Sequence, residues 1–385
     1  MRKQYLSGVL ALVVAGCAAA TTAGIGDPGS ATAPASAPAR EPAEVPALST
    51  LPAAAGGLPR VRLVATGGTI SNRRGGRLTA EELLAAVPGL DTIATVQAEQ
   101  FANTASSAIT LEQWLALARR VEALFREDAG LSGVVVTSGT DTLEELAYFL
   151  HLTVRDRRPV VVTGSMRNPS QVGYEGPANL LAAIRVAATP AAAGRGALVV
   201  LNDEINGARD VTKTDALRLQ TFASRGFGAL GVVDSDRVVF RRNAEGRHTA
   251  TSEFDLDRIE TLPRVDVLLV YQGATGDLLK AAIDLGARGL VLATAGAGAL
   301  SGTQADGLAY ARAKGVPVVT TTRAGTGRIA PPTRPANADA TATPSTPWPR
   351  LAAGDLAAVK ARVLLMLALT RTTDPRELQR ILDEY

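Results

Sequence analysis

Short apolar strands that alternate with helices dominate the chain from residue 61 onward. Four apolar runs are expected to be strands, at residues 61–65, 133–137, 160–163 and 197–201. Alternation of this kind predicts βαβ units, in which a parallel sheet is covered by helices on both faces. An apolar fraction of 46% and a charged fraction of 20% are typical of a globular protein with a well-filled core.

Two of the helices are expected to begin with a capping box. In this motif the threonine side chain accepts a hydrogen bond from the backbone N–H three residues later, and the side chain of the glutamate or glutamine at that position accepts one from the backbone N–H of the threonine. The pairs are Thr79 with Glu82 and Thr110 with Gln113. Helices are therefore expected over residues 79–87 and 110–127, and the apolar pattern predicts another over 178–188.

A second and smaller set of strands and helices follows in the last third of the chain. Residues 233–260 carry many charges and little periodicity, so they are interpreted as a linker. After them, strands are predicted at 265–270, 289–293 and 316–320, with helices at 277–285, 303–314 and 355–369. The predicted fold class is α/β, with a larger N-terminal parallel-sheet domain flanked by helices (61–232) and a smaller C-terminal α/β domain (261–385).

The N-terminal sixty residues predict export. Residues 1–20 begin with Arg2 and Lys3 and continue as an apolar run, which is typical of a signal peptide. The sequence VAGC at residues 14–17 resembles a lipobox, so Cys17 is expected to be lipidated; cleavage after residues 18–20, with Cys17 discarded, is the alternative. Residues 21–60 are rich in Ala, Pro and Thr and are interpreted as a disordered tether. The expected location is periplasmic, with membrane contact only through the lipid anchor.

Charge and residue counts exclude several classes of function. The net charge is +3, from 40 basic and 37 acidic residues, and no basic cluster is interleaved with aromatic residues, so nucleic acid is a poor candidate partner. A single cysteine excludes an intrachain disulfide. The two histidines, His151 and His248, are isolated, which disfavours a zinc site or a Ser-His-Asp triad. We therefore expect chemistry without a metal, a cofactor or a catalytic histidine.

Two hydroxyl-rich turns directly follow predicted strands. The first is TGGT at residues 66–69, and the second is SGTDT at residues 138–142. Each turn by itself could simply be a helix N-cap, because Thr, Ser and Asp all favour that position. Ligands of open parallel sheets, however, bind at the carboxyl ends of the strands. Two such turns in one sheet, each with a potential nucleophile, therefore favour an active site.

These turns resemble the two signature motifs of bacterial L-asparaginases. The matching sequences are ATGGTI at residues 65–70 and TSGTDT at 137–142, and DVTKT at 210–214 is similar to the lysine motif of the family. The likeness extends through residues 164–167, 176–180 and 360–364. The resemblance implies an amidohydrolase that converts L-asparagine into L-aspartate and ammonia, with weaker activity on glutamine. It also implies a homotetramer.

The resemblance further implies a threonine mechanism. Thr69 would attack the side-chain amide carbon and form an acyl-enzyme. Thr140, Lys213 and Asp141 would form a triad-like relay, in which Lys213 is deprotonated by its setting or shares a proton with Thr140. A solvent-exposed surface lysine is the alternative interpretation of Lys213.

The same family positions imply the groups that bind substrate. Backbone amides of the two turns, which include Gly68 and Gly139, would hold the oxyanion. Asp141 would bind the α-ammonium group of the substrate and Ser106 its α-carboxylate. Ser107 stands where the family often has glutamine, and it is also expected to line the substrate site.

The chain departs from the family pattern at several positions. The loop at residues 71–77 has no tyrosine, residues 271–275 do not match the family's asparagine, and residues 322–332 offer no clear match to its glutamate. An exported lipoprotein that binds amino acids without catalysis is therefore an alternative, although a pure binder has no need of the lysine. A nucleotide-binding Rossmann domain is disfavoured, because the turn after the first strand lacks the third glycine.

Overall fold

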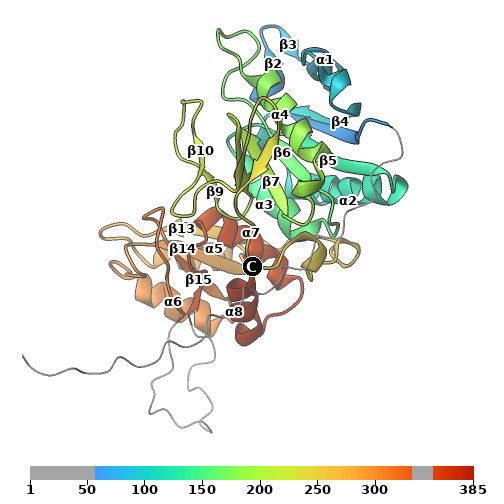
Figure 1. The fold of residues 1–385 in the computed structure, drawn as a ribbon. Helices are drawn as coiled ribbons and strands as arrows, with labels where there is room; N and C mark the ends of the chain where they lie inside the picture. Colours follow the sequence, from blue (N-terminus) through green and yellow to red (C-terminus); the bar gives the residue numbers. More distant parts are fainter. Residues whose placement is uncertain (1–56, 332–349) are drawn as a thin grey trace, which may run out of the picture. The chain divides into compact units, whose positions relative to one another are not determined.

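The computed structural model describes residues 57–331 and 350–385 (Figure 1). The predicted signal peptide, Cys17 and residues 21–56 of the predicted tether lie outside the described residues. The first strand begins at Arg60, the last residue assigned to the tether, because Arg60 pairs with Thr95 and Leu131 on the two neighbouring strands.

A mostly parallel sheet of eight strands forms the larger part of the fold, in the order β12-β11-β8-β7-β6-β5-β1-β4. The strands are β1 (Arg60–Gly67), β4 (Thr95–Thr104), β5 (Leu131–Thr137), β6 (Val160–Thr163), β7 (Ala197–Leu201), β8 (Glu204–Gly207), β11 (Gly231–Val233) and β12 (Val238–Phe240). From β4 to β7 neighbouring strands are parallel, and from β7 to β12 they are antiparallel. The predicted α/β fold class is confirmed.

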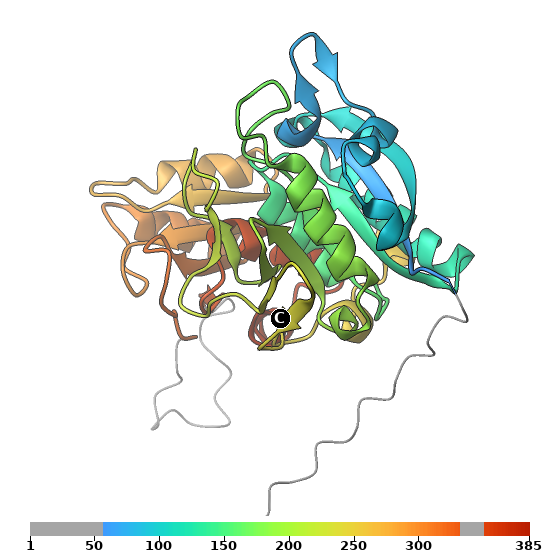
Figure 2. The same cartoon turned by 45° about the horizontal axis from the view of Figure 1, so that its top comes forward.

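Helices cover both faces of this sheet (Figures 1 and 2). They are α1 (Ala80–Ala85), α2 (Leu111–Glu127), α3 (Leu143–Thr153) and α4 (Gly176–Ala188). Along β5 the side chains alternate, as a strand requires: Val134 and Val136 share a core cluster with α2 and α3, whereas Val135 packs with α1 and α4. Both predicted capping boxes are present at the starts of α1 and α2.

Four strands of the large sheet, β4, β8, β11 and β12, were not predicted from the sequence. Strand β4 lies at one edge and is only half buried, so its sequence alternates between polar and apolar residues instead of forming an apolar run. Strand β12 lies at the other edge, within residues 233–260. The interpretation of this whole stretch as a linker is therefore wrong for 238–240, whose polar surroundings reflect an edge position.

A smaller, all-parallel sheet follows, with the strand order β13-β14-β15-β16. Its strands are β13 (Val265–Leu269), β14 (Gly289–Thr294), β15 (Val318–Thr322) and β16 (Leu351–Ala352), and the remaining helices are α5 (Asp277–Asp284), α6 (Gln304–Ala313), α7 (Ala358–Leu369) and α8 (Pro375–Glu384). The apolar side chains of α7 belong to the same core cluster as those of α3, so the two sheets share one core.

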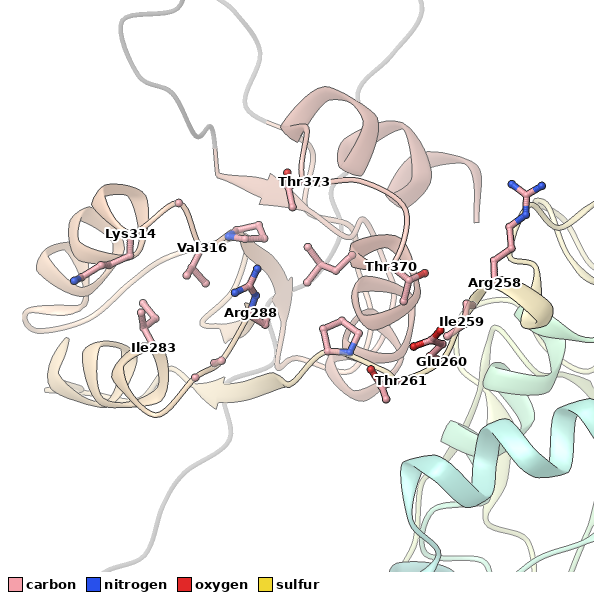
Figure 3. A pocket seen from close by; sticks show the side chains of 16 residues that line it. Arg258, Ile259, Glu260, Thr261, Ile283, Arg288, Lys314, Val316, Thr370 and Thr373 are labelled. Atoms are coloured by element: carbon pink, nitrogen blue, oxygen red, sulfur yellow. The ribbon is translucent and has the colours of Figure 1, made fainter.

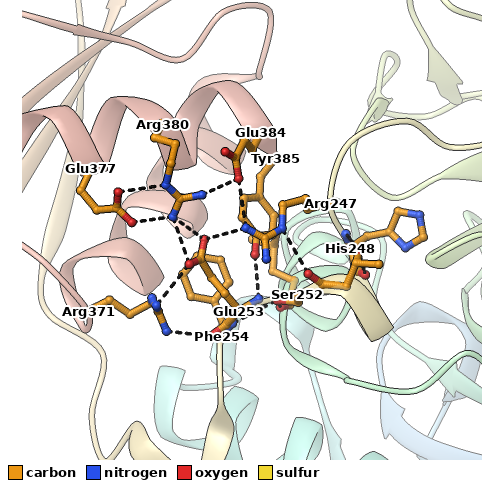
Figure 4. Close-up of polar contacts among 12 residues, drawn as sticks. Arg247, His248, Ser252, Glu253, Phe254, Arg371, Glu377, Arg380, Glu384 and Tyr385 are labelled. Atoms are coloured by element: carbon orange, nitrogen blue, oxygen red, sulfur yellow. Dashed lines mark hydrogen bonds and ion pairs between the residues drawn. The ribbon is translucent and has the colours of Figure 1, made fainter.

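An ion network fixes part of the predicted linker to the C-terminal helix (Figure 4). The carboxylate of Glu253 lies within 3.5 Å of the guanidinium groups of Arg247, Arg371 and Arg380. The hydroxyl of Tyr385 accepts a hydrogen bond from the backbone N–H of Glu253 at 2.8 Å. Residues near 253 are therefore held against α8 by several charge-assisted bonds.

None of the helices in residues 57–331 and 350–385 is both long and apolar enough to cross a membrane.

Candidate active site

The two glycine turns lie against each other at the carboxyl edge of the large sheet. Strands β1 and β5 are parallel neighbours in register, with Ala65 opposite Thr137, so their following turns leave the sheet side by side. A Cβ atom at Gly68 would lie 2.8 Å from the carbonyl carbon of Ser138 and closer still to the backbone of Gly139. Gly68 also has a φ of 87°, a conformation that favours glycine. Only glycine at position 68 therefore allows this backbone contact.

Lys213 reaches the second turn from a separate hairpin. This hairpin consists of β9 (Val211–Lys213) and β10 (Phe222–Ser224). The Lys213 ammonium lies 3.0 Å from the Thr140 hydroxyl and 2.9 Å from an Asp141 carboxylate oxygen. The side chain of Lys213 is 16% exposed and that of Asp141 is 75% exposed. The interpretation of Lys213 as a solvent-exposed surface lysine is therefore wrong, because its charge lies against the threonine of the turn.

Thr140 is almost completely buried, with 5% of its surface exposed. Its hydroxyl therefore depends on the protein for hydrogen bonds, and Lys213 Nζ is one such partner. An amine at this distance can donate a proton to the hydroxyl oxygen when charged and accept one when neutral. The exposed carboxylate of Asp141 is open to a second cation, such as a substrate ammonium group.

Ser106 and Ser107 follow the edge strand β4 at the same edge of the sheet. Both residues are in the short 3-10 helix Ser106–Ala108, which follows β4, the neighbour of β1. Ser106 is 6% exposed, and its hydroxyl would lie only 2.8 Å from a Cβ atom built on Gly139. Ser107 is exposed to solvent. The structure thus brings Ser106 against the second turn, while the assignment of Ser107 to the substrate site stays a prediction.

Thr69 begins the 3-10 turn Thr69–Ser71 directly after Gly68 and is half-buried. The turn is fixed by its neighbours: the Gly68 N–H donates to the Thr104 carbonyl at 2.8 Å, and the Ser71 hydroxyl donates to the Gly68 carbonyl at 3.1 Å. Within the described ranges, no hydrogen bond joins the Thr69 hydroxyl to Lys213. Thr69 therefore lies one residue from Gly68, where the two turns meet. It belongs to the first turn, whereas Lys213 contacts the second.

Glu144 supports the lysine and was not singled out from the sequence. One of its carboxylate oxygens accepts hydrogen bonds from the Lys213 backbone N–H at 3.2 Å and from the Thr212 hydroxyl at 3.0 Å. Its other oxygen is buried and has no hydrogen-bond partner among the described residues. Glu144 lies in the first turn of α3, where a carboxylate is ordinarily explained by the helix dipole, so the sequence offers little signal for this contact.

Lys360 supports the same hairpin from the smaller domain. Its side chain is buried in α7, and its ammonium donates to the backbone carbonyls of Ala208 and Arg209, each at 2.8 Å, and to that of Val211. Burial lowers the pKa of Lys360 to about 8, an effect that the nearby charges of Glu144 and Asp210 partly oppose. Lys360 was part of the family resemblance, but no role was predicted for it.

A pocket of about 620 Å³ lies away from these residues (Figure 3). It is lined by residues 258–261 and 263, by the turn that precedes β14 and by the ends of α6 and α7. None of the predicted site residues lines it. In the described ranges, no group of three or more His, Cys, Asp or Glu side chains could hold a metal ion.

Two family models match the chain along most of its folded part. One is "Asparaginase, N-terminal", over residues 60–246, and the other is "Glutaminase/Asparaginase C-terminal domain", over residues 264–382. Together with the mostly parallel larger sheet and the parallel smaller sheet, these matches define the class of protein: a two-domain α/β amidohydrolase.

Individual relatives match this chain over most of their length and most of its own. The "L-asparaginase 2" of Bacillus subtilis is 41% identical over 338 residues, covering 85% of this chain and 87% of the relative. The "Probable L-asparaginase periplasmic" of Haemophilus influenzae is 37% identical, covering 85% and 93%. A crystal structure of a probable cytoplasmic L-asparaginase from Campylobacter jejuni superposes with a TM-score of 0.75 at 37% identity, covering 86% of this chain and all of that one. The chain belongs to the asparaginase family.

Proposed function

We propose that this enzyme hydrolyses L-asparagine to L-aspartate and ammonia through a threonine nucleophile. The observation that carries the proposal is the contact of Lys213 Nζ with both Thr140 and Asp141, at the edge where the two glycine turns meet. A lysine, a buried hydroxyl and an exposed carboxylate in contact can relay protons. Membership of the asparaginase family supports the same substrate class.

In the first half of the reaction, the Thr69 oxygen attacks the side-chain amide carbon and the C–N bond breaks. The departing nitrogen takes up a proton and leaves as ammonia, while Thr69 retains the aspartyl group as an ester. In the second half, water attacks the ester carbon, the bond between this carbon and the Thr69 oxygen breaks, L-aspartate leaves and the Thr69 oxygen takes up a proton. Thr140 and Lys213 accept and return the protons that these steps require.

Binding of the amino-acid end is assigned to the second turn and its neighbour. The exposed Asp141 carboxylate is suited to the substrate α-ammonium group, and the hydroxyl of Ser106, which lies against Gly139, is suited to the α-carboxylate. Backbone N–H groups of the two turns supply donors for the oxyanion. Glutamine, which is longer by one methylene group, is expected to be a weaker substrate.

Export and assembly are part of the proposal. We infer that residues 1–20 direct export, that Cys17 carries a lipid and that the folded chains form a homotetramer. The lipobox-like sequence at residues 14–17 supports the anchor. In cells, Cys17→Ala should move the protein from the membrane fraction to the soluble fraction. Light scattering of the purified protein should give the mass of four chains.

The test of hydrolysis is ammonia release by the purified protein supplied with asparagine, glutamine or no substrate. Thr69→Ala is expected to lower kcat by at least about 10³-fold, and Lys213→Ala by at least about 10²-fold. Lys280→Ala is the matched control, because Lys280 also pairs with an aspartate but lies on the exposed face of α5. No ammonia release from a wild-type protein that binds L-aspartate would contradict hydrolysis and favour the binding-protein alternative.

A further inference from the structure

The segment that carries Thr69 is contacted by a loop that is distant in sequence. Thr69 leads into a small hairpin of β2 (Asn72–Arg73) and β3 (Gly76–Arg77). The loop between β6 and α4 lies beside this hairpin in both ribbon views (Figures 1 and 2). Two hydrogen bonds join them: the Tyr174 hydroxyl donates to the Ile70 carbonyl at 2.7 Å, and the Arg74 N–H donates to the Ser170 hydroxyl at 2.8 Å.

Hydrogen bonds within the β6–α4 loop hold it in one conformation, so Tyr174 and Ser170 are fixed in position when they contact the hairpin segment. The Asn168 side chain and backbone both bond within the loop: its N–H donates to the Gln171 side chain at 2.8 Å, and its side-chain oxygen accepts from the Ser170 N–H at 2.9 Å. The carboxylate of Glu175 accepts hydrogen bonds from the backbone N–H groups of Met166 and Arg167. A loop with this many internal bonds can position a side chain that it carries.

Tyr174 itself is held by packing as well as by its hydroxyl. A Cβ atom at Gly176 would overlap the Tyr174 ring, so the ring lies directly over the first residue of α4. Burial, with a smaller contribution from the charge of Glu175, raises the pKa of Tyr174 above its usual range. The phenol therefore remains a hydrogen-bond donor to the Ile70 carbonyl at every pH at which the enzyme would work.

We propose that Tyr174 is a positioning residue for the nucleophile turn, and that Ser170 assists it. Thr69 lies between two anchored neighbours. On one side, the Gly68 N–H is bonded to Thr104, and on the other, the Ile70 carbonyl is bonded to Tyr174. The Tyr174 bond adds to two other restraints on this segment, which are the burial of the Ile70 side chain in the core and the hydrogen bond from the Ser71 hydroxyl to the Asn103 side chain at 3.3 Å. The proposal rests on the proposed role of Thr69 as nucleophile.

The test is Tyr174→Phe in the full-length protein, which removes only the hydroxyl. Tyr310→Phe is the matched control, because Tyr310 also donates through its hydroxyl, to Asp284 at 2.6 Å, but lies on the smaller domain. Hydrogen exchange of the peptide 69–78 and steady-state kinetics with asparagine are measured for wild type and both variants. In Tyr174→Phe, exchange of this peptide should be about tenfold faster and kcat about tenfold lower, with KM changed less than about twofold. Tyr310→Phe should match wild type.

Ser170→Ala should make hydrogen exchange of residues 73–75 faster as well, but by a smaller factor, because it removes only the hydroxyl that accepts the hydrogen bond from the Arg74 N–H. The proposal is overturned if Tyr174→Phe exchanges like wild type, or if its exchange rises while kcat remains at the wild-type value. If the wild-type protein releases no ammonia, hydrolysis itself fails, and the exchange rates alone decide whether Tyr174 holds the turn.

Discussion

Replacing Gly68 with alanine tests how tightly the two glycine turns of the candidate site must meet. The new Cβ atom would lie 2.8 Å from the carbonyl carbon of Ser138, whereas ordinary van der Waals contact begins at 3.4 Å. The turns would therefore separate by at least about 0.6 Å (3.4 minus 2.8), and by more against the closer backbone of Gly139. Alanine at a φ of 87° adds about 1–2 kcal/mol of backbone strain.

The expected effect on the reaction follows from this displacement. A shift approaching 1 Å between reacting groups can lower a rate by about 10²-fold, which corresponds to about 2.7 kcal/mol of activation free energy. Gly68→Ala should therefore lower kcat for asparagine by about 10²-fold and reduce the free energy of unfolding by about 2–4 kcal/mol. Ammonia release and urea unfolding measure the two quantities.

Gly75→Ala separates the steric effect from backbone strain. Gly75 has nearly the same φ, 82°, and lies in the exposed β2–β3 turn, where a Cβ atom would meet no atom of the described chain within 4 Å. It should lose about 1 kcal/mol of stability and keep kcat within about twofold of wild type. If Gly68→Ala retained the kcat of Gly75→Ala, close contact of the two turns would not be required and the reasoning would be refuted.

Three further predictions concern buried ionisable groups. Burial lowers the pKa of both His151 and His248, so below about pH 6.5 the unfolded chain binds protons that the native chain does not bind. The free energy of unfolding is therefore retained above about pH 6.5 and should fall as the pH decreases below it, by at most about 1.4 kcal/mol per pH unit for each histidine. Urea unfolding between pH 8 and 5 checks this slope, and His151→Gln should flatten it. Lys360→Met leaves the three carbonyls of Ala208, Arg209 and Val211 without this donor and should lower the free energy of unfolding by about 3–5 kcal/mol, measured by urea unfolding. An unchanged midpoint of the urea transition would show that these bonds do not stabilise the protein. Glu144→Gln weakens the support of Lys213 and should lower kcat about tenfold with little change in KM; wild-type kinetics would exclude this role.

Local patterns in the sequence predicted the central parallel strands, several helix starts and the sheet edge that carries the candidate site. Apolar runs such as Val160–Thr163 could be predicted as strands because a strand buried on both faces needs apolar residues throughout. The capping threonines Thr79 and Thr110 located helix starts because a cap is a contact between residues three apart. The turns at residues 66–69 and 138–142 could be predicted to share an edge, since parallel strands end on the same side of a sheet.

Only the tertiary structure decided which distant side chains support those turns. The contact of Lys213 with Thr140 spans 73 positions, that of Tyr174 with Ile70 spans 104, and that of Lys360 with Ala208 spans 152. The edge strand Val238–Phe240 was missed for the same reason, because its partner lies elsewhere and its three apolar residues are too short a run to stand out among the charged residues that flank them. A hydrogen bond between remote segments depends on how the whole chain packs, and no local periodicity records that distance.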